Sequence, residues 1–171
     1  GGTTDLLTVT LGRGRVASVA RLGRSADLHA GQFVDRVGVR LGLPFPCGKH
    51  LEQLAAKAAE TGLRIPSSVR GMNCSFSGAE TQAGRLIESG ADRAATAFAV
   101  YGCLARTVEK LVRNARAETG VADVLLCGGV SGSAAPRTTT RCRMVKSRMR
   151  QRIPGAAFWL TYADIFSRYR H

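Results

Sequence analysis

Apolar and polar positions alternate along the start of the chain, in two runs separated by a glycine-rich turn. Residues 5–11 and 15–21 are rich in strand-forming side chains, and Gly12-Arg13-Gly14 lies between the two runs. Alternation on both sides of a short glycine turn is typical of a β-hairpin. The pattern therefore predicts two antiparallel strands.

The period then changes from that of strands to that of helices. Residues 26–41 carry apolar side chains every three or four positions, and Pro44 cannot continue such a helix. A second helix is predicted for about 49–60, with Gly62 after its end. Residues 63–78 hold two prolines and several Ser and Gly residues, so we expect a loop with at most one short strand.

The longest periodic stretch, 91–118, predicts a helix that ends at Gly120. An uninterrupted apolar run follows at 121–127 and is typical of a buried strand. After Arg137 the pattern resembles neither helix nor strand.

These elements together predict an α/β domain. We expect the strands at 5–11, 15–21 and 122–127 to share one mixed sheet, with the long helix packed against it. At 171 residues the chain is long enough for one domain with its own core, and no apolar run reaches the roughly 20 residues of a membrane helix.

Cysteine and histidine usage gives no metal or disulfide pattern. The five cysteines are odd in number and form no C-x-x-C, which favours a reducing compartment and argues against a zinc ribbon. The three histidines lie far apart in sequence. We therefore expect no metal site made by this chain alone.

The net charge of +13 is concentrated towards the end of the chain. Residues 138–171 hold 8 basic residues and 1 acidic residue, whereas residues 1–137 hold 17 and 11. Such an excess attracts polyanions, of which tRNA is the obvious candidate. A solvated basic tail without a specific partner explains the same charge.

Two glycine pairs and one carboxylate are candidates for chemistry. Gly1-Gly2 precedes the first predicted strand, and Gly128-Gly129 follows the last. Glycine lets backbone N–H groups approach phosphate oxygens, although most Gly-Gly pairs are ordinary turns. Asp35 lies in an apolar helical stretch, where it could accept hydrogen bonds from sugar hydroxyls or pair with Arg36 or Arg40.

Five segments, read in order, resemble the TsaD family of tRNA threonylcarbamoyltransferases, also called Gcp or glycoprotease-like proteins. The resemblance runs from residue 1 to about 137. The segments are Gly1-Gly2-Thr3-Thr4, Ala30-Gly31-Gln32-Phe33-Val34-Asp35-Arg36, Leu41-Gly42-Leu43-Pro44-Phe45-Pro46-Cys47-Gly48, Asn73-Cys74-Ser75-Phe76-Ser77-Gly78 and Gly128-Gly129-Val130-Ser131-Gly132-Ser133.

The resemblance implies a nucleotide-binding portion at 1–137 and a basic, divergent segment at 138–171. It implies an actin/Hsp70/sugar-kinase fold of two lobes and transfer of a threonylcarbamoyl group from its adenylate to N6 of adenosine 37 in tRNA. Carried over by position, Gly1 and Gly2 belong to the phosphate loop. Asp35 and Gly48 contact the nucleoside, and Ser133 stands where the family has an adenylate-binding Asn. Cys47 replaces a family Gly, and Thr3 a His.

The resemblance also implies a divalent metal, iron or zinc, in the full-length family. Its ligands are two upstream histidines and the Asp of a C-terminal Asp-Asn pair. In this sequence the basic stretch 150–154 stands where that pair is expected, just before Gly155-Ala156-Ala157-Phe158, which resembles a small-residue helix of the family. A shifted reading frame over about 138–153 and a divergent paralogue both explain this departure.

We therefore expect an incomplete chain that does not bind the metal or catalyse the transfer alone. We also expect its sheet to leave an uncovered apolar face near Leu6, Val9 and Leu11. The expected partners are threonylcarbamoyl-adenylate, tRNA and other proteins of the modification pathway in the cytoplasm, with no membrane. The alternatives are a non-catalytic nucleotide-binding paralogue and, less well matched, a sugar or carboxylate kinase of the same fold.

Overall fold

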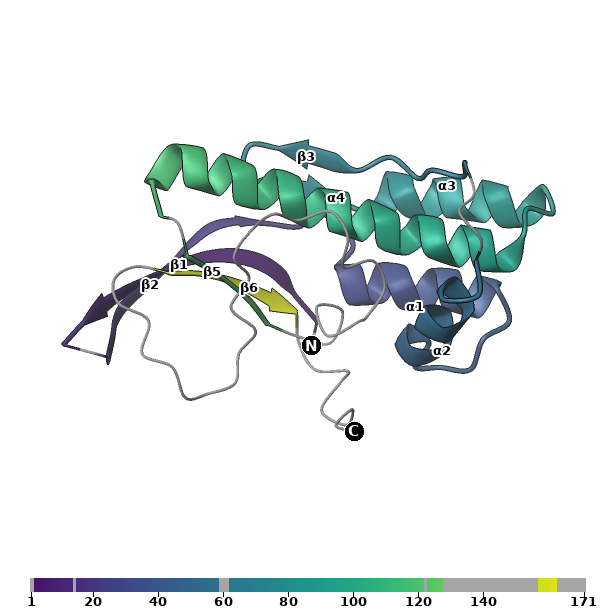
Figure 1. Ribbon diagram of the computed structural model, residues 1–171, viewed down its shortest axis with the longest axis horizontal. Helices are drawn as coiled ribbons and strands as arrows, with labels where there is room; N and C mark the ends of the chain where they lie inside the picture. The colour runs from purple at the N-terminus through teal and green to yellow at the C-terminus, as the bar shows by residue number, and fades with distance from the viewer. Residues whose placement is uncertain (1, 14, 59–61, 122, 128–156, 163–171) are drawn as a thin grey trace.

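A mixed sheet and a group of helices lie next to each other and are joined along the longest helix (Figure 1). This computed structural model describes residues 2–13, 15–58, 62–121, 123–127 and 157–162. In that part of the chain, helices and strands are mixed as the α/β prediction requires. The predicted division of the chain at about residue 137 stays a prediction.

The larger sheet contains all three predicted strands. Its order is β2 (Arg15–Arg24), β1 (Thr4–Gly12), β6 (Ala157–Tyr162) and β5 (Asp123–Cys127). β1 is antiparallel to β2 and to β6, whereas β5 runs parallel to β6. The prediction of one mixed sheet built from the hairpin and the later strand is confirmed.

β6 was not predicted. It lies between β1 and β5, and its residue Leu160 is paired with Leu6 on one side and Leu126 on the other. The likeness of 155–158 to a helix is wrong at residues 157 and 158, which lie in β6. The basic stretch that resembled neither helix nor strand lies outside the described residues. The signal was local and went unused, because aromatic and β-branched residues, which favour strands, make up most of the run 157–162.

α1 (Ala30–Arg40) begins four residues later than the predicted start at residue 26. Asp27 lies three residues before this start. Its side chain accepts a hydrogen bond from the Leu28 amide at 2.6 Å and further hydrogen bonds from residues 75–77. A side chain that bonds its own neighbouring backbone competes with helix formation. The helix therefore starts only after this segment, where His29 N donates to Gln32 Oε1 at 3.0 Å.

α2 (Gly48–Ala55) is shorter than the predicted helix at 49–60. Beyond it, Lys57 N bonds Leu54 O and Ala58 N bonds Ala55 O, both at 3.1 Å. Bonds that span three residues belong to a tighter turn, which ends the α-helical geometry.

The expected loop at 63–78 holds two strands and the start of a helix. β3 (Ser68–Arg70) and β4 (Asn73–Ser75) form a small antiparallel sheet, and α3 (Ser77–Glu88) follows. The expectation of at most one strand is therefore wrong. α3 escaped prediction because its buried face consists of Ala79, Ala83 and Gly84, which give little hydrophobic contrast.

α4 (Arg93–Thr119) confirms the predicted long helix. At its start the Asp92 side chain accepts a hydrogen bond from Ala95 N at 2.7 Å, as an N-cap does. At its end Gly120 has φ of 70°, the left-handed conformation that closes many helices.

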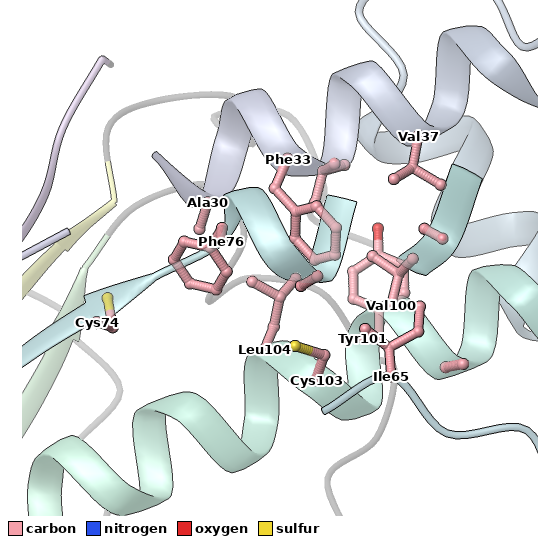
Figure 2. Packing of buried hydrophobic residues seen from close by; sticks show 14 of the residues in the cluster. Ala30, Phe33, Val37, Ile65, Cys74, Phe76, Val100, Tyr101, Cys103 and Leu104 are labelled. Atoms are coloured by element: carbon pink, nitrogen blue, oxygen red, sulfur yellow. The ribbon is translucent and has the colours of Figure 1, made fainter. Parts of the chain in front are cut away.

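The core lies among the four helices and extends to the sheet. Phe33 of α1 and Phe76, just before α3, stack with ring centroids 5.6 Å apart. Figure 2 shows these rings above the α4 side chains Val100 and Leu104. Leu6 belongs to the same buried cluster.

The predicted uncovered face near Leu6, Val9 and Leu11 is wrong for its first two residues. Leu6 is 1% exposed and Val9 2% exposed. The exposed apolar side chains of the hairpin lie instead on its outer strand, where Val16 and Val19 are each 55% exposed. None of the helices in the described ranges is long and apolar enough to span a membrane.

Candidate functional site

Asp35 bonds directly to the segment that contains the next candidate residue. This half-buried side chain of α1 accepts a hydrogen bond from Cys47 N on Oδ1 at 2.8 Å. Within the described residues, Oδ2 accepts no hydrogen bond. Arg40, one of the two expected partners of Asp35, forms an ion pair with Glu80 at 3.0 Å instead.

Gly48 is the first residue of α2 and is buried. Its carbonyl oxygen accepts a hydrogen bond from the Tyr101 hydroxyl at 3.0 Å, which ties the start of α2 to α4. Cys47 thus places the predicted site residues Asp35 and Gly48 next to each other. Sequence reasoning missed Tyr101, although a hydroxyl on a buried helix face needs a partner and is a detectable signal.

Cys47 fills the space between α1 and α2 and is fully buried. A Cβ built on Gly38 of α1 would lie 2.2 Å from the Cys47 Cβ, so only glycine fits at position 38. Burial, together with the nearby Asp35 carboxylate, raises the pKa of the Cys47 thiol. At neutral pH the side chain is a buried thiol, which is a poor nucleophile. Cys47 therefore has a packing role.

The start of β1 lies against the start of α1. Ala30 N donates to Thr4 Oγ1 at 3.0 Å, and Ser25 N donates to Thr4 O at 2.9 Å. Gly2, two residues before Thr4, has open space where a Cβ would stand. Since five residues of helix rise about 7.5 Å, Asp35 lies within about two turns of this end of α1.

Four of the candidate residues lie outside the described part of the chain: Gly1, Gly128, Gly129 and Ser133. The structure therefore joins Asp35 with Gly48 and places Gly2 near the first turn of α1. Convergence of the full set on one site stays a prediction.

Asp27 is a second carboxylate that organises this region, and the sequence reasoning did not single it out. It accepts hydrogen bonds from the hydroxyls of Ser75 and Ser77, both at 2.5 Å, and from the Phe76 amide at 2.8 Å. Burial raises the pKa of Asp27, but these hydrogen bonds and that of the Leu28 amide outweigh it and hold the pKa well below its usual range. The side chain joins the start of α1 to the start of α3.

The residues that the structure describes offer no group of three or more His, Cys, Asp or Glu side chains able to hold a metal ion. The donor sets in this part of the chain do not fit the metal that the resemblance implies. The chemistry available to the described site consists of carboxylate acceptors and backbone groups.

Comparison with known proteins gives a consistent family. The model of the family described as TsaD, tRNA N6-adenosine threonylcarbamoyltransferase, matches residues 6–159. A probable bifunctional tRNA threonylcarbamoyladenosine biosynthesis protein of Methanothermobacter thermautotrophicus is 37% identical over 131 residues, covering 77% of this chain and 23% of the relative.

Two further relatives are named tRNA N6-adenosine threonylcarbamoyltransferase. That of Thermococcus gammatolerans is 34% identical over 134 residues, which are 78% of this chain and 39% of the relative. That of Thermus thermophilus is 37% identical over 139 residues, which are 79% of this chain and 41% of the relative. The chain thus spans about two fifths or less of the length of these relatives. Because the family model covers most of the chain, the protein belongs to the TsaD family.

Proposed function

We propose that this chain is the nucleotide-binding portion of a tRNA N6-adenosine threonylcarbamoyltransferase. In this proposal it has an actin/Hsp70/sugar-kinase fold and acts in the cytoplasm with threonylcarbamoyl-adenylate, tRNA and other proteins of the pathway. Support comes from membership of the TsaD family and from relatives with that name.

The observation that carries the proposal is the 2.8 Å hydrogen bond from Cys47 N to Asp35. It joins two segments, twelve residues apart, that the family resemblance assigns to one nucleoside. The bond fixes the carboxylate through Oδ1, and none of the described residues donates a hydrogen bond to Oδ2. An ionised carboxylate only accepts hydrogen bonds, and ribose hydroxyls can donate them.

The remaining family positions complete the proposed site. Gly1 and Gly2 would approach the phosphate with their backbone N–H groups, for which Gly2 has the necessary open space. Ser133 would offer a hydroxyl to the adenylate. In the full-length family a divalent metal, iron or zinc, would supply Lewis-acid chemistry, and the described residues of this chain offer no ligand set for it.

Removal of the Asp35 charge tests the proposal. We expect Asp35→Asn to weaken binding of AMP and of threonylcarbamoyl-adenylate about 10-fold, because a charge-assisted hydrogen bond contributes about 1.5–3 kcal/mol before solvent screening. Isothermal titration calorimetry measures the change. Asp5→Asn is the matched control, since Asp5 lies on β1 and pairs with Arg21. Equal affinities for wild type and Asp35→Asn would contradict the proposal.

The inactivity of residues 1–171 on their own stays a prediction. Incubation with threonylcarbamoyl-adenylate, unmodified tRNA and a divalent metal, followed by mass spectrometry of the nucleosides, measures it. Modified adenosine formed without an added protein would show the prediction to be wrong.

A further inference from the structure

Arg106 is a cation of α4 whose charge has no counter-ion in the described part of the chain. Its Nη2 donates to Ile65 O at 2.7 Å, whereas its buried Nε has no hydrogen-bond partner among the described residues. Burial and the nearby Arg64 guanidinium lower the pKa of Arg106. Two positive charges therefore lie close together, and no ion pair within the described residues offsets their repulsion.

Further basic side chains extend this pair along the helix. Arg106, Lys110 and Arg113 are four and three residues apart on α4, so they lie on one helix face over about 10 Å. The exposed Arg64 and Arg70 belong to the segment beside this face. Figure 1 shows β3, which ends at Arg70, next to α4. These five residues form the α4 cation stripe.

Hydrogen bonding to the neighbouring segment does not require the charges of the stripe. Lys110 Nζ donates to Ser67 O at 3.3 Å. One turn further on, the neutral amide of Asn114 donates to Gly71 O at 2.7 Å. A neutral donor therefore serves the same purpose on the same helix face, and the positive charge of the stripe needs another explanation.

Few acidic residues are near the stripe in sequence. None occurs between residues 62 and 76 or between residues 93 and 108. Glu109 is next to Lys110, and with it the stripe still has five basic side chains against one carboxylate. The two ion pairs identified within the described residues join β1 to β2 and α1 to α3. The stripe is therefore a concentrated positive surface that attracts polyanions.

The composition of the stripe favours the phosphate backbone of RNA over other polyanions. A row of cations over about 10 Å of helix matches a linear chain of phosphates better than a single small anion. Residues 62–71 and 106–113 contain no aromatic side chain on which a base could stack. Contacts to phosphate alone position a nucleic acid without reading its sequence.

A lipid surface or a protein partner fits the stripe less well. Both ordinarily bury apolar or aromatic side chains beside the charges. The exposed large hydrophobic side chains among the described residues lie instead on β2, on α1 and in the segment before α2.

We propose that the α4 cation stripe binds the phosphate backbone of tRNA. The inference rests on the proposed function, in which tRNA is the acceptor, and adds a surface on this chain that holds it. The family carry-over assigns none of the five residues to a site. The stripe is also separate in sequence from the basic segment 138–171.

Neutralisation of three stripe residues tests the inference in the full chain. The triple variant Arg64→Gln, Lys110→Gln, Arg113→Gln loses three charges and keeps an N–H donor at each position. We expect it to bind an unmodified tRNA transcript at least about 10-fold more weakly than wild type. The slope of log K against log salt concentration should fall by about 2–3, because each phosphate contact contributes about 0.7–0.9. Fluorescence anisotropy over a salt series measures both quantities.

Two further variants separate the stripe from total charge. The triple variant Arg15→Gln, Arg24→Gln, Arg85→Gln removes three exposed charges from β2 and α3 and should bind tRNA nearly as wild type does. The charge-conserving triple variant Arg64→Lys, Lys110→Arg, Arg113→Lys should also retain binding. Equal weakening by the two neutralised triple variants would overturn the inference. If the stripe variant does not fold, as judged by thermal unfolding, the single variants Arg64→Gln and Arg113→Gln should each lower the slope by about 1.

The AMP titration of wild type and Asp35→Asn distinguishes this inference from the proposed function. If AMP binding depends on Asp35 while neutralisation of the stripe leaves tRNA binding unchanged, the inference is wrong and the proposed function stands. If tRNA binding depends on the stripe while AMP does not bind, the stripe is an RNA surface and the proposed nucleotide site is wrong. Stripe-dependent binding to phosphatidylserine vesicles, with no binding to tRNA, would also overturn the inference.

Discussion

Single residues decide how closely α1 and α2 approach. Gly38 leaves room for Cys47, and a Cβ at position 38 would lie 2.2 Å from the Cys47 Cβ. We expect Gly38→Ala to lower the free energy of unfolding by about 1–3 kcal/mol, the usual cost of overpacking. Urea denaturation followed by circular dichroism measures the loss.

A matched control for this prediction lies on the same helix. Gly31 has nothing within 4 Å of its built Cβ, so Gly31→Ala should be neutral or stabilising. In the double variant Cys47→Gly with Gly38→Ala the clash disappears. The double variant should therefore be more stable than Gly38→Ala alone. If it is not, the contact between position 38 and Cys47 does not cause the loss of stability.

Asp27 should make the stability of the protein depend on acid pH. Its pKa in the folded protein is depressed below the ordinary value of 3.8. The carboxylate therefore stabilises the fold above about pH 4, and this stabilisation is lost as the pH falls through the folded value. Because Asp27 is exposed, we expect an effect of only about 1 kcal/mol.

Thermal unfolding between pH 3 and pH 7 measures the effect of Asp27. Asp27→Asn should unfold at lower temperature than wild type at pH 7, and the difference should shrink towards pH 3 as the Asp27 carboxyl of the unfolded chain takes up a proton. Asp5→Asn serves as the charge-matched control, because Asp5 lies on β1. A difference that stays constant across this range would contradict the role of the charge.

At the scale of elements, α4 holds the segment 65–71 through a line of side chains. Arg106 Nη2 donates to Ile65 O at 2.7 Å, and Asn114 Nδ2 donates to Gly71 O at 2.7 Å. Between them Lys110 Nζ donates to Ser67 O at 3.3 Å. Positions four apart lie on one helix face, so the three donors follow the segment along the helix.

Asn114→Ala should loosen the small sheet of β3 and β4. Loss of one hydrogen bond of this kind costs about 1 kcal/mol, which raises local opening about fivefold. Hydrogen exchange measured by mass spectrometry should show faster labelling of peptides covering 68–75. Arg113→Ala, at the exposed neighbouring position, is the control. If the two variants label this sheet at the same rate, the hydrogen bond from Asn114 to Gly71 does not restrain it.

The elements with strong local patterns could be predicted from sequence, and those defined by distant contacts could not. The hairpin, α4 and β5 follow from alternation, helical period and an apolar run. The predicted start of α1 was wrong because Asp27 accepts hydrogen bonds from residues about 50 positions away. In the site, periodicity placed Asp35 on a helix, but only the family resemblance paired it with Gly48. The Cys47 amide that joins them has no sequence signal.

At the scale of the whole molecule, the sheet depends on β6. This strand pairs with β1 on one side and β5 on the other, so it joins the hairpin to the strand that follows α4. A proline in a central strand removes a backbone donor and is found almost only at edges. We expect Leu160→Pro to lower the melting temperature clearly, as measured by differential scanning fluorimetry. Ser18→Pro in the edge strand β2 is the comparison, and it should do less damage.

The position of β6 also bears on the order in which the protein is made and folded. Leu6 pairs with Leu160, so Leu6 is synthesised 154 residues before its partner. At about 5–20 residues per second, that interval is roughly 8–30 s. The hairpin and the helices can form during this interval. The edge of β1 that later pairs with β6 has unpaired backbone groups until then. An open edge invites pairing with other chains, so nascent chains of this protein are candidates for chaperone protection during translation.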